Sequence, residues 1–477
     1  MPCISSLRIR NKSKHQAAMQ RSTTTSFQTV LIAMVFVAYG CSSVVEPPES
    51  QLSDNSSVAS DPIDSIPSRV AGSNDSISET DDPKTLSQPP KVNRDISWPN
   101  WMGAKHDGIS HESGWSSEWP ADGLPVVWSR EIGIGFSSVS IANNRLFTMG
   151  HIDGFEQVVA LKNETGEPIW SHKYECQLVD NLHEGGPGAT PTIDGEFVYS
   201  LGREGQLFCL RAKSGDVVWS KSLQNDLELR MPEWGFTSSP YILGDQLILE
   251  AGRVVSYNKK TGEKNWQTDE HSAGYGSAIA FQHEGHTLLA TFDCDGLRIL
   301  EAANGEQVVF ARWDSPFGTN STTPIVKDGM IYVSSGYGVG CGLFRLKDSK
   351  LEMVYSNRRM RNHFNNSILL DGHVYGFDGN SNLGRVVQLK CMNFESGEVA
   401  WKQRGLGCGS LMIADGKLLI LGEDGTLVLA KATPEGFQEL ARSPFLDGRC
   451  WTVPVLLNGR VYGRNADGKL ICVRLPP

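Results

Sequence analysis

Five short stretches of the sequence place aromatic rings beside groups that bind polar ligands or transfer protons. They are His183–Pro187, Glu233–Phe236, Gly274–Gly276, Phe317–Asn320 and Asn362–Asn365. Carboxylate, imidazole and amide groups near such rings could hold a polar ligand, and a Glu or His among them could act as a general acid or base. Our candidates for a ligand or cofactor pocket are Glu184, Trp234, Tyr275, Asn320, Asn362, His363 and Asn365. The alternative is that these side chains fill the centre of a fold and satisfy one another.

The elements that must position these stretches are strands of a repeated unit, whose clearest copy is Thr190–Trp219. Short runs rich in β-branched and aromatic residues alternate there with Asp-Gly, Arg-Glu-Gly and Ser-Gly breaks. Such runs between glycine turns are typical of antiparallel strands. The copy ends on a Trp four residues after the turn glycine Gly215, and the same ending returns at Trp170, Trp266 and Trp401.

The spacing of these endings predicts the fold. Trp128 precedes the first complete copy, and weaker copies place Val309, Tyr355 and Leu440 at the closing position. A period of about 45 residues fits four short strands with their turns, which is one blade of a β-propeller. We predict an all-β, eight-bladed β-propeller of four-stranded antiparallel blades, with seven blades as the alternative. The five stretches would then precede the first strands of successive blades and project from one face.

The two ends of the repeat region complete each other. Val126–Arg130 is a strand with no blade before it, whereas the last copy, Cys450–Leu475, has no closing Trp. We therefore expect the N-terminal strand to finish the last blade and close the ring. Trp98 and Trp101 begin the ordered structure, and the turn around them is expected to pack against the propeller.

The repeat resembles a known family. Its Thr-Gly-Glu-x-x-Trp endings, preceded by Gly-x-Leu-x-x-Leu, are similar to the PQQ-like (quinoprotein-type) propeller repeat over Trp98–Leu475. Stretches such as Trp234–Pro240 and Arg361–Ser367 resemble the polyvinyl-alcohol-dehydrogenase-like branch, and the layout also resembles the outer-membrane assembly lipoprotein propeller. The resemblance implies the fold but not the chemistry, because this scaffold serves both enzymes and non-catalytic lipoproteins.

A resemblance to the dehydrogenases of this family would imply three features around the cofactor. They are a vicinal Cys-Cys disulfide, a Trp platform, and a Glu/Asn/Asp set that holds Ca²⁺ beside a catalytic Asp. The sequence has 10 cysteines but neither a Cys-Cys pair nor a Cys-x-x-Cys spacing, so no metal ligand set is readable. Asp293–Gly296 resembles the opening of a Ca²⁺ loop but lacks the later ligands. We assign no catalytic residue and no metal ligand, and PQQ with Ca²⁺ stays open as a cofactor. Buried free thiols are expected, as at Cys209 and Cys472.

The N-terminal residues 1–40 have the features of an export signal peptide, with basic residues before a short apolar run at Val30–Ala38. Cys41 follows this run as in a bacterial lipoprotein box, which predicts lipidation of Cys41; ordinary cleavage and release of a soluble protein is the alternative. Residues 41–95 are rich in Ser, Asp, Asn and Pro, which predicts a disordered tether. Residues 96–477 form the expected PQQ-like β-propeller.

Charge narrows the choice of partner. The net charge is -10 and the repeats hold no Lys/Arg cluster, so we expect no nucleic-acid binding. Our first hypothesis is an exported monomer, periplasmic or anchored to the outer membrane through its lipid only, that acts as a binding or assembly scaffold. Its partners would be envelope proteins or a small polar ligand. The second is a PQQ-dependent quinoprotein alcohol dehydrogenase that uses Glu184, Trp234, Asn320, Asn362 and His363. The absence of a Cys-Cys pair and of a readable Ca²⁺ ligand set favours the scaffold hypothesis.

Overall fold

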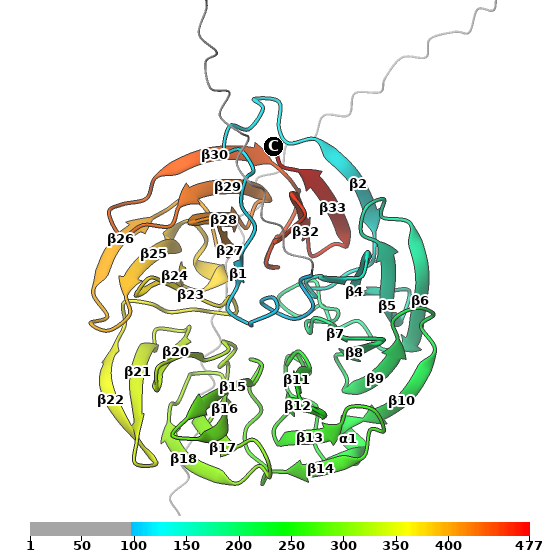
Figure 1. Ribbon diagram of the computed structural model, residues 1–477, viewed down its shortest axis with the longest axis vertical. Coiled ribbons are helices and arrows are strands. Elements are labelled where there is room, and N and C mark those ends of the chain that lie inside the picture. The colour runs from blue at the N-terminus through cyan, green and yellow to red at the C-terminus, as the bar shows by residue number, and fades with distance from the viewer. Residues whose placement is uncertain (1–96) are drawn as a thin grey trace, which may run out of the picture. The chain divides into compact units, whose positions relative to one another are not determined.

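The computed structural model describes residues 97–477, which form eight antiparallel sheets around a central axis (Figure 1). This confirms the predicted eight-bladed, all-β propeller and sets aside the seven-bladed alternative. The signal peptide, Cys41 and the tether expected from the sequence lie outside the described residues.

Each blade has an inner, a second, a third and an outer strand. The inner strands are β3 (Ser140–Ala142), β7 (Thr192–Asp194), β11 (Tyr241–Leu243), β15 (Ile279–His283), β19 (Ile325–Lys327), β23 (Ile368–Leu370), β27 (Ser410–Ala414) and β31 (Val455–Leu457). The second strands are β4 (Arg145–Ile152), β8 (Phe197–Leu201), β12 (Gln246–Glu250), β16 (His286–Phe292), β20 (Met330–Ser335), β24 (His373–Asp378), β28 (Lys417–Leu421) and β32 (Arg460–Arg464).

The third strands are β5 (Phe155–Lys162), β9 (Gln206–Arg211), β13 (Val254–Asn258), β17 (Gly296–Glu301), β21 (Gly340–Lys347), β25 (Gln388–Asn393), β29 (Thr426–Lys431) and β33 (Lys469–Arg474). The outer strands are β6 (Pro168–Glu175), β10 (Val217–Ser222), β14 (Lys264–Gln267), β18 (Gln307–Arg312), β22 (Lys350–Asn357), β26 (Val399–Gln403), β30 (Glu439–Pro444) and β2 (Val126–Glu131). We number the blades 1 to 8 from the one that begins with β3.

The sequence pattern of each strand follows its place in the blade. Strands β12 and β13 are buried along almost their whole length, because a blade packs against a neighbour on both of its faces. The outer strand β10 has mostly exposed side chains around the buried Trp219. The described part of the chain contains only two short helical segments, α1 (Leu223–Asp226) and η1 (Ser381–Val386). Neither has the length or the apolar character of a membrane-spanning helix.

The closing Trp of a blade packs against the next blade. The Trp219 ring covers Gly262, which has φ +72° and where a Cβ would approach the indole to 2.8 Å. The indole Nε1 donates to the Lys259 carbonyl at 3.0 Å, and Trp128, Trp170 and Trp401 make the corresponding bond. Trp219 and Trp401 are buried, as the repeat predicts, whereas Trp170 and Trp266 are only partly buried. The indole of Trp266 bonds to Gln246 of its own blade instead.

The ring closes through the N-terminal strand, as predicted. Strand β2 pairs antiparallel with β33, and Trp128 lies opposite Cys472. Arg464 adds a second connection between blades 8 and 1, because its fully buried guanidinium donates to the carbonyls of Gly133 and Met149 at 2.7 and 2.5 Å.

The end of the axis at which the inner strands finish is covered by residues 98–116, which we call the plug. Within it, β1 (Ile109–Ser110) pairs in parallel with β27, so the sheet of blade 7 has five strands instead of the expected four. Trp98 bridges to Ile141 of β3, and the Pro99 carbonyl accepts a bond from Ile193. The turn at Trp98 therefore packs against the propeller, as predicted, and crosses the centre of the ring (Figure 1).

Candidate functional site

The opposite end of the axis carries the candidate site. Antiparallel strands place the loops that enter the inner strands on the same face as the turns between second and third strands. We call this end the mouth. All five stretches selected from the sequence lie in the entering loops, as Tyr275 does before β15 and His363 before β23.

Aromatic rings follow one another around the mouth. We define the aromatic belt as Phe136, His183, Trp234, Tyr275, Phe317, Tyr337, His363, Phe364 and Trp451. Eight of these rings form a continuous series in which neighbouring ring centroids lie between 4.3 and 5.6 Å apart. The order of the series is Phe317, Tyr337, His363, Phe364, Trp451, Phe136, His183 and Trp234. The Tyr275 hydroxyl accepts from the Trp234 backbone N–H at 3.5 Å. Loops of seven blades therefore contribute to one partly exposed aromatic surface.

Two carboxylates beside the belt accept hydrogen bonds, one from Arg449 and one from Trp451. Glu184, a candidate from the sequence, accepts from Arg449 Nη1 at 3.0 Å, and this guanidinium lies 4.6 Å from the Trp451 ring. The Trp451 indole donates to Glu423 at 2.9 Å. Arg449 and the two carboxylates thus hold Trp451 in place from two sides.

The histidines of the belt are neutral near pH 7. Burial lowers the pKa of His363 to about 4, and its Nε2 lies 3.0 Å from the Tyr337 hydroxyl. Burial also lowers the pKa of His183, against the opposing charge of Glu184. Burial raises the pKa of the Tyr275 hydroxyl to about 12. These groups therefore offer hydrogen bonds rather than charge.

The three candidate amides lie beneath the belt. Asn320 donates to the carbonyls of Asp293 and Trp313, and Asn362 donates to the carbonyl of Phe377. Asn365 donates to the Gly409 carbonyl, while its Oδ1 has no hydrogen-bond partner among residues 97–477. The structure thus brings Glu184, Trp234, Tyr275 and His363 together at the surface of the mouth and places the amides in its wall.

Below the mouth, polar side chains link the inner strands around the axis. In four successive pairs of blades a backbone N–H bonds to a hydroxyl of the next blade: Ser138 to Thr190, Thr190 to Ser239, Ser239 to Ser277, and Ser277 to Thr323. Thr323 continues to Asn366, and the Ser138 hydroxyl donates to Val453 of blade 8. These side chains, none of which is a candidate from the sequence, link one another around the axis.

A cavity of about 380 Å³ opens beside the mouth and is lined by Tyr275, Cys294, His271 and Glu233, among others. His271 Nε2 donates to Glu250 at 2.8 Å, and its Nδ1 lies 3.2 Å from the Asp269 carbonyl. Burial alone would lower the pKa of His271, but the charge and hydrogen bond of Glu250 raise it. The pKa of His271 is therefore higher than that of a free histidine, because the buried Glu250 carboxylate favours the protonated ring.

Asp293 belongs to the same buried group. It accepts from Arg298 Nε at 3.0 Å, and its other oxygen bonds to the backbone N–H groups of Asp295 and Gly296. These bonds stabilise a turn at Asp293–Gly296, the segment that resembles the opening of a Ca²⁺ loop. Among residues 97–477 no three His, Cys, Asp or Glu side chains group closely enough to hold a metal ion. The eight cysteines in this range are free, and seven of them are buried.

Sequence reasoning missed Phe136, Arg449 and Trp451. The signal was present, because these residues precede β3 and β31 just as the five selected stretches precede their inner strands. The first and last copies of the repeat are incomplete, so the repeat alone does not align their entering loops with those of the other blades.

The chain resembles known proteins in sequence and in fold. The family model described as outer membrane protein assembly factor BamB matches residues 154–403. No curated protein sequence matches the chain. BamB from Moraxella catarrhalis has 17% identity and a TM-score of 0.54, covering 74% of this chain and 100% of that one.

Two further solved structures share the fold. Quinohemoprotein alcohol dehydrogenase from Comamonas testosteroni has 12% identity and a TM-score of 0.61, covering 81% of this chain and 82% of that one. The computationally designed Ika8 protein has 12% identity and a TM-score of 0.53, covering 74% of this chain and 100% of its own. At such identities these structures show a common propeller fold and no common chemistry.

Proposed function

This chain belongs to the family described as outer membrane protein assembly factor BamB, and from this premise we propose that it is a non-catalytic scaffold of the cell envelope. The aromatic belt would bind a segment of a partner protein. Protein-binding surfaces are enriched in Trp, Tyr, Phe and Arg, and a few such residues supply most of the binding energy. The belt, with Arg449 above Trp451, has this composition, and it is the observation that carries the proposal.

The surroundings of the belt support a protein partner. Leu182 is 80% exposed and Phe317 is 74% exposed, although both are large apolar residues of loops at the mouth. A partner that covers Leu182 and Phe317 would remove both apolar side chains from water.

The residues at the mouth do not fit PQQ with Ca²⁺ as the quinoprotein dehydrogenases would hold it. The Trp451 ring, one possible platform, is already in contact with Phe136 and Phe364 at 5.2 and 4.3 Å. The carboxylate of Glu184 is paired with Arg449. The cysteines of the described range are free, so they form no disulfide above such a platform. We therefore derive no oxidation step for this site.

Photo-crosslinking in the expressing cell tests the scaffold. We expect a photoreactive amino acid at Phe317 or Leu182 to trap a defined envelope protein, because both side chains border the belt. The same amino acid at Met353, which is 55% exposed on the outer strand β22, is the matched control and should trap none. Trp451→Ala should reduce the yield at 317 by about tenfold or more, since truncating a central aromatic anchor costs about 2 kcal/mol or more.

Two outcomes contradict the scaffold. One is an equal yield of crosslinked protein from positions 317 and 353. The other is a change in absorbance when PQQ and Ca²⁺ are added to the purified protein, which would favour the dehydrogenase.

We also propose that Cys41 carries the lipid that attaches this scaffold to a membrane. The support is in the sequence, where Cys41 follows a short apolar run after a basic segment. Cys41→Ser should move the protein from the membrane pellet to the soluble fraction without changing its thermal unfolding. Cys3→Ser is the matched control and should stay in the pellet. Wild-type protein that is already soluble, with no acyl mass on its N-terminal peptide, would show that the anchor is absent.

A further inference from the structure

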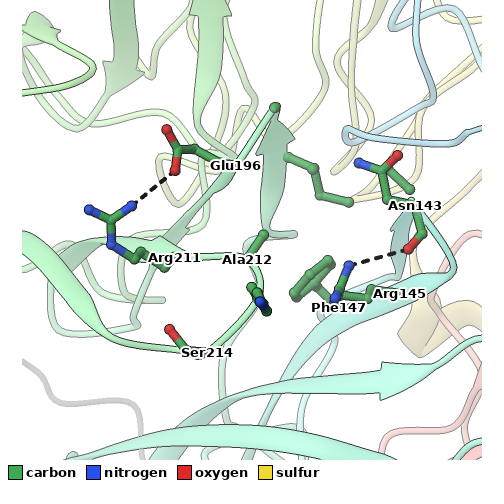
Figure 2. Close-up of a pocket in the computed structure, with 11 residues that line it drawn as sticks. Asn143, Arg145, Phe147, Glu196, Arg211, Ala212 and Ser214 are labelled. Carbon is green, nitrogen blue, oxygen red and sulfur yellow. Dashed lines mark hydrogen bonds and ion pairs between the residues drawn. The ribbon is translucent and has the colours of Figure 1, made fainter.

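A second cavity, of about 330 Å³, lies between blades 1 and 2 on the face that carries the plug (Figure 2). Its apolar lining includes Phe147, Ile193 and the alanines at 142 and 212, and Phe147 rests against Trp170 at 5.7 Å between ring centroids. The plug is close to it, since Pro99 bonds to the backbone of Ile193. This cavity is far from the belt in the fold, because the turns that form it leave the inner strands at their other ends.

The charged lining of this cavity is predominantly positive. Arg145, Arg211 and Lys213 face a single carboxylate, Glu196. Arg211 donates to Glu196 at 2.9 Å, which neutralises both groups, as the dashed line in Figure 2 shows. Two cations therefore remain without a counter-charge on the lining of a cavity in a protein whose net charge is -10.

Arg145 is incompletely bonded. Its Nη1 reaches the carbonyl of Asn143 at 3.4 Å, as Figure 2 shows. Its Nε is shielded from solvent and has no hydrogen-bond partner among residues 97–477, as is also true of Arg460. The guanidinium presents N–H donors in a planar fork that matches a carboxylate.

The neighbouring pair of blades, 8 and 1, provides a direct comparison, because an Arg opens the second strand there too. Arg460 opens β32 of blade 8 as Arg145 opens β4 of blade 1. Arg460 lies 3.9 Å from Glu164, which stands two residues before the turn glycine Gly166 of the next blade. At the corresponding place of blade 2, two residues before Gly215, the chain has Lys213. The cavity between blades 1 and 2 is therefore lined by two cations, Arg145 and Lys213, where the neighbouring pair of blades has a cation and a carboxylate.

We propose that this cavity binds a small organic anion with an apolar body. Its carboxylate would take the place of the missing Glu between Arg145 and Lys213, where charge-assisted hydrogen bonds are strongest. Its apolar part would lie against Phe147 and Ile193. The site belongs to a different face from the proposed scaffold surface and is independent of it.

Ligand-observed NMR and calorimetry with three matched probes test this site. Benzoate should bind, whereas benzyl alcohol and benzylamine, which have the same ring but no negative charge, should bind at least about tenfold more weakly. Lys213→Glu should abolish benzoate binding, because it restores the internal carboxylate of the neighbouring blade pair. Glu196→Gln should strengthen binding, because it releases Arg211 from its pair.

The controls separate a local site from a loss of folding. Lys213 is exposed, so Lys213→Glu should unfold at the wild-type temperature or above it. Arg145→Met should weaken benzoate about tenfold or more, while Arg460→Met, the same substitution in the neighbouring blade, should leave its affinity unchanged. Equal binding of benzoate and benzyl alcohol, or unchanged benzoate binding by folded Lys213→Glu, would overturn the proposal.

Discussion

A chain that begins at Gly133 is expected to lose most of its stability. This truncation removes β2, and with it the antiparallel pairing to β33 and the buried side chains of Trp128 and Ile132. Removing one buried Trp costs about 3–5 kcal/mol, against a total of about 5–15 kcal/mol for a typical domain. It also exposes β33 as an edge strand, which favours aggregation.

A chain that begins at Glu118 is the matched comparison, because it lacks the plug but keeps β2 and the closed ring. Thermal unfolding and light scattering of both chains at equal concentration measure the difference. We expect the chain from Gly133 to melt at a clearly lower temperature and to aggregate. Cooperative melting of that chain within a few degrees of the chain from Glu118 would mean that β2 does not close the ring energetically.

Trp219→Ala should destabilise the propeller by about 3–5 kcal/mol, as expected for deletion of a large buried side chain. The Trp219 side chain is 9% exposed and packs on Gly262 of the next blade, so its loss opens a cavity between blades. The Lys259 carbonyl also loses the donor that the indole supplies at 3.0 Å. Urea unfolding, followed by circular dichroism, gives the change in the free energy of unfolding.

Trp266→Ala is the informative control. Trp266 occupies the same position of its blade but is less buried, and its indole bonds to Gln246 within its own blade. We therefore expect a smaller loss, because no bond between blades is broken. If Trp219→Ala and Trp266→Ala lower the free energy of unfolding equally, the stabilising effect of this position does not come from burial between blades.

Much of the fold could be predicted from the sequence because each blade is specified locally. The turn glycines and the closing Trp recur in every clear copy, so positions such as Gly215 and Trp219 predict strand boundaries without any knowledge of distant contacts. The incomplete first and last copies predicted the pairing of β2 with β33 for the same reason. That the candidate loops share one face followed from the regular alternation of strand direction, which is also a local property.

The chemistry of the mouth could be predicted only in part. Selecting the residues that precede the inner strands identified Glu184, Trp234, Tyr275 and His363, which the structure places together at the mouth. It could not distinguish them from Asn320, because whether an amide faces a ligand or a backbone carbonyl depends on the side-chain direction within a packed loop. The pairing of Glu184 with Arg449 joins residues 265 positions apart, so no local pattern predicts it.

The sequence by itself determined the repeat, a closed ring of eight or seven blades and the face on which the entering loops gather, since these follow from strand length, turn residues and alternation. Only the tertiary structure decided that the plug covers the other end, and that Arg145 and Lys213 line one cavity between blades 1 and 2. Both depend on which side chains of different blades meet across an interface. These contacts depend on how whole blades pack around the axis, so the sequence of a single blade does not predict them.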